Sequence, residues 1–223
     1  MALDKIKNIV ESKKNISNQK KDSWEWRYFF YDKKFKESIT NKIKNYSPQP
    51  VHKQFTDEYI ISPSLIHNIK LRKNNNNTIE KLHIKKIIKT SSNLYKFSSK
   101  IIISFPISNK HIFNVEKLGI PKIRKVTSDT ASFRKSLNQS SKEIFLISIK
   151  KEITLYDIKN AYSGLGKKIR FEISEITIKN KLVYTISIKC KSKKVITKAL
   201  KKFEIDDLKG TDYISFIKGL AKV

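Results

Sequence analysis

The chain has 223 residues and carries 48 Lys and Arg against 20 Asp and Glu, a formal net charge of +28 that is spread over both halves. A folded body this basic repels itself unless a polyanion lies against it. A hydrophobic fraction of 39% excludes a wholly disordered chain, and the single Cys190 excludes an intrachain disulfide framework and a cysteine-based zinc site.

The charge has two interpretations. One is a partner such as a nucleic acid or another polyanion. The other is the codon bias of an A/T-rich genome, which explains 43 Lys against 5 Arg but not why Glu fails to balance them. No apolar run reaches signal-peptide length or the ~18 residues of a membrane helix. We therefore expect an intracellular protein, cytoplasmic or nuclear, that is not secreted and has no membrane partner.

In chain order, the first predicted element is a short helix over residues 3–10, whose apolar residues share one face, followed by a polar loop. Residues 1–22 thus precede a single domain over residues 23–223. An aromatic-rich run over residues 24–31 lacks a helical period and indicates a strand. Residues 35–46 can form a helix that the following prolines end.

The middle of the chain predicts β structure, and residues 117–142 carry no legible pattern. The strand candidates are apolar or alternating runs bounded by turn residues. They cover residues 59–61, 66–72, 79–88, 94–107 and 144–155.

The most regular pattern lies near the C-terminus. Residues 169–178 and 182–190 alternate and are joined by a short polar turn, which predicts a hairpin; the alternation slips once after Ile173. Helical faces follow over residues 195–203 and 213–220, the second capped by Asp212. About eight strands in mostly meander order, with helices at both ends, predict an α+β fold: a curved antiparallel β-barrel with flanking helices.

Common catalytic signatures are missing from the sequence. Residues 164–168 (GLGKK) lack the spacing and the Ser/Thr of a phosphate loop and precede a strand, so we interpret them as a turn. The four histidines have no ligand spacing on a helix. The metal site, if there is one, stays unknown from the residues alone.

Three strands place charges at alternating positions, which face the same side of a sheet. They are Glu25 and Arg27, Lys70 and Arg72, and Arg170 and Glu172. One interpretation is the wet face of a half-buried sheet, with cross-strand ion pairs of little energy. The other is a charged barrel interior that holds a phosphate chain. Alternation alone favours the wet face.

The order of these motifs resembles the triphosphate tunnel metalloenzymes, the CYTH-like barrels that include RNA 5′-triphosphatases of mRNA capping. The resemblance covers residues 24–203 and rests on short motifs in the family's order. They are Glu25-Trp26-Arg27, Lys70-Leu71-Arg72, Leu82–Lys85, the strand 101–107 that runs into a proline turn, Ile149–Thr154, Ile169–Ser174 and Tyr184–Cys190.

The resemblance implies a tunnel in which basic residues hold a triphosphate and glutamates hold Mg²⁺ or Mn²⁺. This chain departs from that pattern where carboxylates are expected: it has Arg27, Ser104, Thr185, Ser187 and Lys189. A basic residue in a cation site repels the cation, so no cofactor is certain, and a degenerate copy that keeps the anion affinity without full hydrolysis is implied.

From these observations we assign candidate site residues. The phosphate contacts are Arg27, Lys70, Arg72, Lys85, Lys150 and Arg170. Glu25 and Glu172 are catalytic if the chain is an enzyme, with Mg²⁺ or Mn²⁺. Trp24 and Trp26 are candidate stacking surfaces for bases.

The predicted function is a basic nucleic-acid- or polyphosphate-binding protein, with RNA favoured over DNA and a role in 5′-end processing or transcription. One alternative is an active metal-dependent RNA 5′-triphosphatase of mRNA capping. Another is a structural subunit of a large nucleic-acid-containing assembly, to which the even spread of charge is equally suited.

Overall fold

The structure, a computed structural model, describes residues 22–47, 49–74, 80–108, 111, 115–120, 128–158 and 168–221. The helix predicted over residues 3–10 and most of the turn predicted over residues 164–168 lie outside these ranges.

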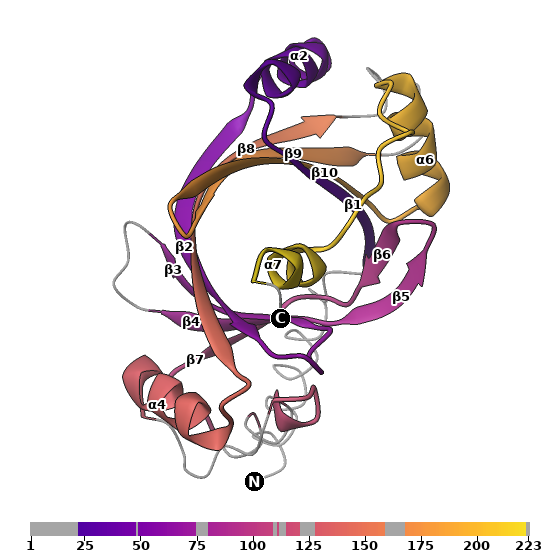
Figure 1. The fold of residues 1–223 in the computed structure, drawn as a ribbon. Helices are drawn as coiled ribbons and strands as arrows, with labels where there is room; N and C mark the ends of the chain where they lie inside the picture. The colour runs from indigo at the N-terminus through magenta and orange to yellow at the C-terminus, as the bar shows by residue number, and fades with distance from the viewer. Residues whose placement is uncertain are drawn as a thin grey trace, which may run out of the picture.

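Ten antiparallel strands form one sheet that curls into a ring (Figure 1). The strand order is β5-β6-β1-β10-β9-β8-β2-β3-β4-β7. The first strand of this order, β5, follows the ninth, β4, in the chain with only Lys86 between them. The strands are β1 (Ser23–Phe30), β2 (Val51–Ile61), β3 (Asn68–Asn74), β4 (Lys81–Lys85), β5 (Ile87–Ser91), β6 (Leu94–Phe97), β7 (Ile101–Ser104), β8 (Phe145–Ile158), β9 (Ile169–Ile178) and β10 (Lys181–Cys190).

The curved antiparallel barrel with helices is therefore confirmed, with ten strands where the sequence predicts about eight. Two strands differ most from prediction. β2 begins at Val51, eight residues before the predicted strand; its first four residues are exposed and show no apolar alternation, so the sequence does not reveal them as a strand. The predicted strand over residues 79–88 is divided at Lys86 into β4 and β5, which do not pair: β5 is the first strand of the order and β4 the ninth.

The β9–β10 hairpin sets the inner and outer faces of the barrel. Its register is continuous, and Lys179 and Asn180 form the turn with positive φ angles of 47° and 62°. Ile173 belongs to an outer core cluster, whereas Ile176 belongs to a cluster on the inner face. The predicted slip after Ile173 is therefore wrong: the alternation continues, and burial passes from one face of the strand to the other.

In the part of the chain that the structure describes, three helices cover the outer face of the barrel. The helix α2 (Lys33–Lys44) begins at Asp32, whose carboxylate accepts from two backbone N–H groups of the first turn. It packs with α6 (Lys193–Lys202) over the outer faces of β1, β9 and β10. The helix α4 (Thr130–Ser140) lies within the segment for which the sequence predicts no element, and it covers β3 and β4 through Phe133 and Leu137.

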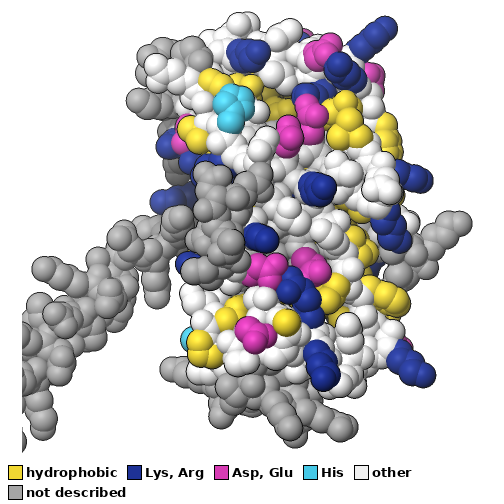
Figure 2. All heavy atoms as spheres, turned by 90° about the vertical axis from the view of Figure 1, so that its left-hand side faces the viewer, with side chains coloured by type: hydrophobic (Ala, Val, Ile, Leu, Met, Phe, Trp, Pro, Cys, Tyr) yellow, Lys and Arg dark blue, Asp and Glu magenta, His cyan; other side chains and the backbone are white. Residues whose placement is uncertain are grey.

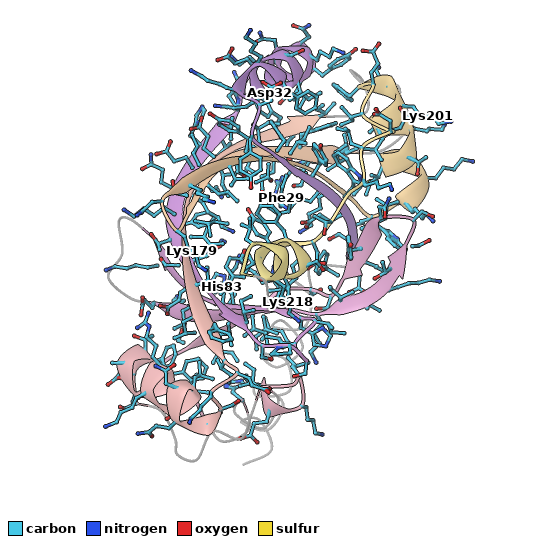
Figure 3. All side chains as sticks on the ribbon, in the orientation of Figure 1. Phe29, Asp32, His83, Lys179, Lys201 and Lys218 are labelled. Carbon is cyan, nitrogen blue, oxygen red and sulfur yellow. The ribbon has the colours of Figure 1, made fainter. Side chains whose placement is uncertain are left out.

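A fourth helix, α7 (Tyr213–Ala221), lies inside the ring (Figure 1). Asp212 caps it as predicted, accepting from the N–H groups of Ile214 and Ser215. Ile214 and Ile217 pack against inner-face residues of five strands. Figure 3 shows Phe29 of β1 pointing into the ring toward this helix, and its ring stacks on that of Phe216 at 3.8 Å.

The chain reaches the inside of the barrel at Gly210. The N–H of Thr211 donates to the carbonyl of Arg27 at 2.7 Å, so this segment pairs with the part of β1 beyond the end of β6. A Cβ on Gly210 would lie 2.6 Å from the ring of Trp26 and 2.9 Å from the carbonyl oxygen of Asn93. Only a glycine fits this crossing. Among the described residues, no helix is long and apolar enough to span a bilayer.

Candidate functional site

A first cluster of charges surrounds Arg27 on the inner face of β1. Its guanidinium donates to Glu172 of β9 at 2.8 Å and to Glu25 at 3.3 Å. It also donates to the hydroxyls of Thr185 at 2.6 Å and Ser187 at 3.1 Å on β10. Alternation on three neighbouring strands thus brings five polar side chains to one place.

These groups stay charged although they are buried. Burial alone would raise the pKa of Glu25, but Lys85 and Arg27 hold it well below its ordinary value. Lys85 reaches Glu25 from β4, with its Nζ 2.5 Å from the carboxylate. Burial alone would lower the pKa of Arg27, and Glu172 and other anionic neighbours raise it instead.

A second cluster surrounds Asp57 of β2, which is fully buried. Arg72 grips its carboxylate with two hydrogen bonds of 2.6 and 2.8 Å. Lys70 and Lys151 lie 2.7 and 3.0 Å from the same carboxylate, and both donate to the hydroxyl of Tyr59. Three basic side chains therefore share one carboxylate, and burial lowers the pKa of Lys70 well below its ordinary value although Asp57 opposes this effect.

Positive charge exceeds negative charge inside the barrel. Burial and the nearby Arg72, against the opposing effect of Asp57, together lower the pKa of Lys151 to about 8. Burial and the neighbouring cations lower the pKa of His83, on the inner face of β4, to about 3, so its imidazole is neutral. Such an interior attracts an anion that supplies the missing charge.

Exposure falls steadily along the inner face of β9 and identifies the end that solvent reaches. The side chains of Lys168 and Arg170 are 61% and 46% exposed, that of Glu172 is 23% exposed, and Ile176 is fully buried. Lys168 and Arg170 pair with Asp157 of β8 at this open end, which we call the mouth. The opposite end is filled by α7.

The family resemblance implies a divalent cation, but the residues present do not fit one. The guanidinium of Arg27 contacts both Glu25 and Glu172, so it fills the space between the two carboxylates that would serve as ligands. Hard cations require several oxygen ligands. In the described part of the chain, no group of three or more His, Cys, Asp or Glu is placed to hold a metal ion.

Most of the predicted phosphate-binding and catalytic residues come together inside the barrel, and one of them lies outside. Lys70 and Arg72 meet at Asp57, Lys85 joins Arg27 and the two glutamates, and Arg170 stands at the mouth. Lys150 instead lies on the exposed outer face of β8, and its neighbour Lys151 points inward. The placement of Lys150 in the tunnel is therefore wrong by one residue.

The sequence contains a pattern that places Lys151, and not Lys150, on the buried inner face of β8. The apolar residues Ile147, Ile149 and Ile153 share its parity on β8, and these positions are all buried. Asp57 carries no comparable signal, because the strand predicted from the sequence begins only at Tyr59.

The predicted stacking residues lie on the outer face of β1. Trp26 is 1% exposed and lies beneath Gly210, so the prediction that it stacks on a base is wrong. Trp24 is partly buried against the same outer cluster. Its role stays a prediction, and a base stacked on it would lie outside the tunnel.

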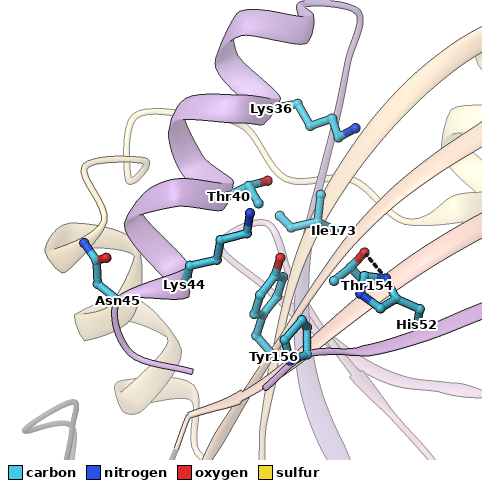
Figure 4. A pocket seen from close by; sticks show the side chains of 9 residues that line it. Lys36, Thr40, Lys44, Asn45, His52, Thr154, Tyr156 and Ile173 are labelled. Carbon is cyan, nitrogen blue, oxygen red and sulfur yellow. Dashed lines mark hydrogen bonds between the residues drawn. The ribbon is translucent and has the colours of Figure 1, made fainter. Parts of the chain in front are cut away.

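A pocket of about 550 Å³ lies outside the barrel, between α2 and the outer faces of β2, β8 and β9 (Figure 4). Lys36 and Lys44 line it from α2, and His52 and Thr154 share a hydrogen bond on its far wall. Lys36 is already paired with Glu175. The pocket therefore lacks the convergent cations of the interior.

The outer surface that Figure 2 shows has no concentration of cationic side chains either. In Figure 2, Lys and Arg side chains on the described part of one face are spread singly, with acidic side chains between them. Arg134 of α4, for example, bonds both Glu58 and Glu80. The barrel interior is therefore the candidate site.

No family model and no curated protein matches the sequence, but solved structures match the fold. The RNA triphosphatase domain of a trifunctional mimivirus mRNA capping enzyme aligns with a TM-score of 0.52 and 14% identity over 90% of this chain and 95% of that chain. A Hippeastrum protein described as an adenylyl cyclase with a dominant triphosphatase activity aligns with a TM-score of 0.51 and 13% identity, over 90% of this chain and 96% of that chain. A conserved hypothetical protein from Pyrococcus furiosus aligns with a TM-score of 0.50 and 14% identity, over 86% of this chain and 98% of that chain.

These likenesses define the fold of the chain as that of the triphosphate tunnel, or CYTH-like, proteins. The resemblance stated from the motifs is confirmed at the level of the fold. The neighbours' activities belong to the neighbours, and the function of this chain depends on the residues inside its own barrel.

Proposed function

We propose that the barrel binds the phosphate chain of an RNA 5′ end, or of a related polyphosphate, without a divalent cation and without hydrolysing it. The observation that carries the proposal is the position of Arg27, whose guanidinium bonds both Glu25 and Glu172. A permanent cation of the chain thus lies where the fold's triphosphatases are expected to need a metal ion.

Binding follows from the excess of cations. The two clusters hold five basic side chains (Arg27, Lys70, Arg72, Lys85 and Lys151) against three carboxylates (Glu25, Asp57 and Glu172). Arginine can grip two phosphate oxygens at once, and lysine acts as a mobile point charge. A phosphate chain that enters at the mouth meets Arg170 first and then both clusters.

The lack of hydrolysis follows from the same guanidinium. Arg27 can neutralise phosphate charge, but it has no open coordination position and activates no water as a metal ion does. Glu25 and Glu172 are occupied as its partners, so neither is free to act as a general base.

The net charge of +28 supports RNA as the bearer of the phosphate chain. The body of an RNA would lie on the outer surface while its 5′ end occupies the tunnel, and the outer contact would be sequence-independent and sensitive to salt. An intracellular location, and membership of a larger RNA-containing assembly, belong to this proposal.

The proposal is tested by comparing a 5′-triphosphate RNA with its 5′-hydroxyl twin over a salt series, while phosphate release is followed with and without Mn²⁺. We expect tighter binding of the triphosphate end by about tenfold or more, an advantage that persists as salt rises, and no release. Equal affinities would contradict the tunnel as the binding site.

A matched pair of variants locates the binding. Lys151→Met should remove most of the triphosphate preference, whereas Lys150→Met, one residue away on the outer face, should preserve it. Thermal melting of both variants checks that they fold. Release of phosphate with Mn²⁺ that disappears in Glu25→Ala would instead establish the metal-dependent triphosphatase.

A further inference from the structure

The inner end of the tunnel is closed by the chain itself. α7 fills the barrel opposite the mouth, and Ile214 and Ile217 are buried against β1, β2, β8, β9 and β10. Figures 1 and 3 show this helix inside the ring of strands. A phosphate chain that enters at the mouth cannot pass through, so it must stop at the first turn of α7.

Tyr213 is the residue that α7 presents at this point. Its ring stacks on Tyr59 at 5.4 Å, and the guanidinium of Arg27 lies 4.5 Å from the ring centre. The Nζ of Lys151 lies 3.7 Å from the same centre. Tyr213 therefore touches both charge clusters from the closed end of the tunnel.

The hydroxyl of Tyr213 is buried and has no hydrogen-bond partner among the described residues. Tyr213 as a whole is 6% exposed. A buried hydroxyl without a partner destabilises a fold, and native proteins rarely leave one unsatisfied. Burial raises the pKa of Tyr213 well above its ordinary value, so the phenol stays protonated and can donate.

Other side chains on the inner face also have buried polar atoms without a hydrogen-bond partner. The described residues contain four buried side-chain atoms without a partner, and His83 and Asn68 join Tyr213 on the inner face of the barrel. Only Thr40 of α2 lies outside the barrel. The unmet hydrogen-bonding capacity is thus concentrated where the excess positive charge is.

We propose that the tunnel recognises the free end of a phosphate chain, and that the hydroxyl of Tyr213 donates to an oxygen of the terminal phosphate. This inference rests on the proposed function and restricts its ligand class. Linear chains with a free terminal phosphate fit the closed tunnel, whereas chains that carry a nucleoside at both ends do not.

The test uses two ligands with the same number of phosphates: GTP, with one free end, and P1,P3-di(guanosine) triphosphate, with none. Affinities are measured by calorimetry in EDTA at constant ionic strength. The wild type should bind GTP about tenfold or more tightly than the blocked ligand. Tyr213→Phe should weaken GTP binding by about ten- to a hundredfold, as loss of one hydrogen bond to a charged group does.

Tyr156→Phe serves as the matched control, because Tyr156 is equally buried but lies on the outer face of β8. It should change neither affinity, and the blocked ligand should be indifferent to Tyr213→Phe. Equal binding of the two ligands, or an unchanged affinity of Tyr213→Phe for GTP, would overturn end recognition while the proposed function stands. Failure of both ligands to bind would overturn both.

Discussion

The guanidinium of Arg27 neutralises the carboxylates of the buried Glu25 and the half-buried Glu172, and it is itself held by two hydroxyls of β10. Such a network is sensitive to the loss of one member, because removing the cation leaves unpaired buried charges. We expect Arg27→Met to destabilise the fold by about 3–5 kcal/mol, measured by urea unfolding near neutral pH. An unchanged free energy of unfolding would show that the network is solvated.

A double variant separates charge from packing at this position. Glu172→Gln added to Arg27→Met removes one of the two unpaired carboxylates, so it should restore part of the lost stability. If the two substitutions destabilise the protein additively, Arg27 and Glu172 are not coupled and the description of the first cluster is wrong.

Lys151 gives the binding reaction a pH dependence. Burial lowers its pKa to about 8 in the free protein, and a bound anion favours its protonated form. The affinity for tripolyphosphate should therefore be highest below about pH 8 and fall as Lys151 loses its proton above it. Calorimetry at about pH 6.5 and pH 9.5 measures the effect, which we expect to be about three- to tenfold.

Tripolyphosphate also titrates, so Lys151→Met is the reference for this experiment. The pH dependence that remains in the variant belongs to the ligand and to other groups. A wild-type profile that coincides with that of the variant would contradict the assignment of Lys151 to the binding site.

At the scale of elements, the β9 strand shows what the sequence could and could not predict. The hairpin with β10 follows from alternation and its turn, and both are confirmed. The apparent slip after Ile173 arises because helices bury one face at one end of β9 and α7 buries the other face at the other end. Hydrophobicity alone records burial and does not identify the face.

The same limitation explains why the closed end of the tunnel was not predicted. The apolar face and the cap of α7 are legible in the sequence, but they are equally compatible with a helix on the outside of the barrel. Its place depends on Gly210, where the chain passes close to Trp26. A close approach of two distant segments leaves no periodic signal.

Two glycine substitutions test this crossing. Gly210→Ala would place a Cβ within 3.0 Å of Trp26 and of the Asn93 carbonyl, so it should destabilise the protein by about 1–3 kcal/mol. Gly219→Ala, within α7, meets no atom within 4 Å and should stabilise it by about 0.5–1 kcal/mol. Thermal unfolding distinguishes them, and similar effects of the two would contradict the packing at Gly210.

For the whole molecule, the charge of +28 has two consequences that differ in their response to salt. Contacts on the outer surface release counterions, so binding of a 5′-hydroxyl RNA should weaken steeply between about 50 and 200 mM salt. Buried pairs are screened much less. The preference for a triphosphate end should therefore persist over this range, and filter binding of the two RNAs measures it. If the preference for the triphosphate end instead disappears as salt weakens the binding of both RNAs, the triphosphate binds on the outer surface.

The most direct measurement of the central claim is the affinity for tripolyphosphate by calorimetry, first in EDTA and then with Mn²⁺ added. Because Arg27 fills the space between Glu25 and Glu172, we predict binding in EDTA that Mn²⁺ does not tighten. Binding that appears only with Mn²⁺, or that Mn²⁺ tightens by about tenfold or more, would show that the carboxylates hold a metal ion and would contradict the account.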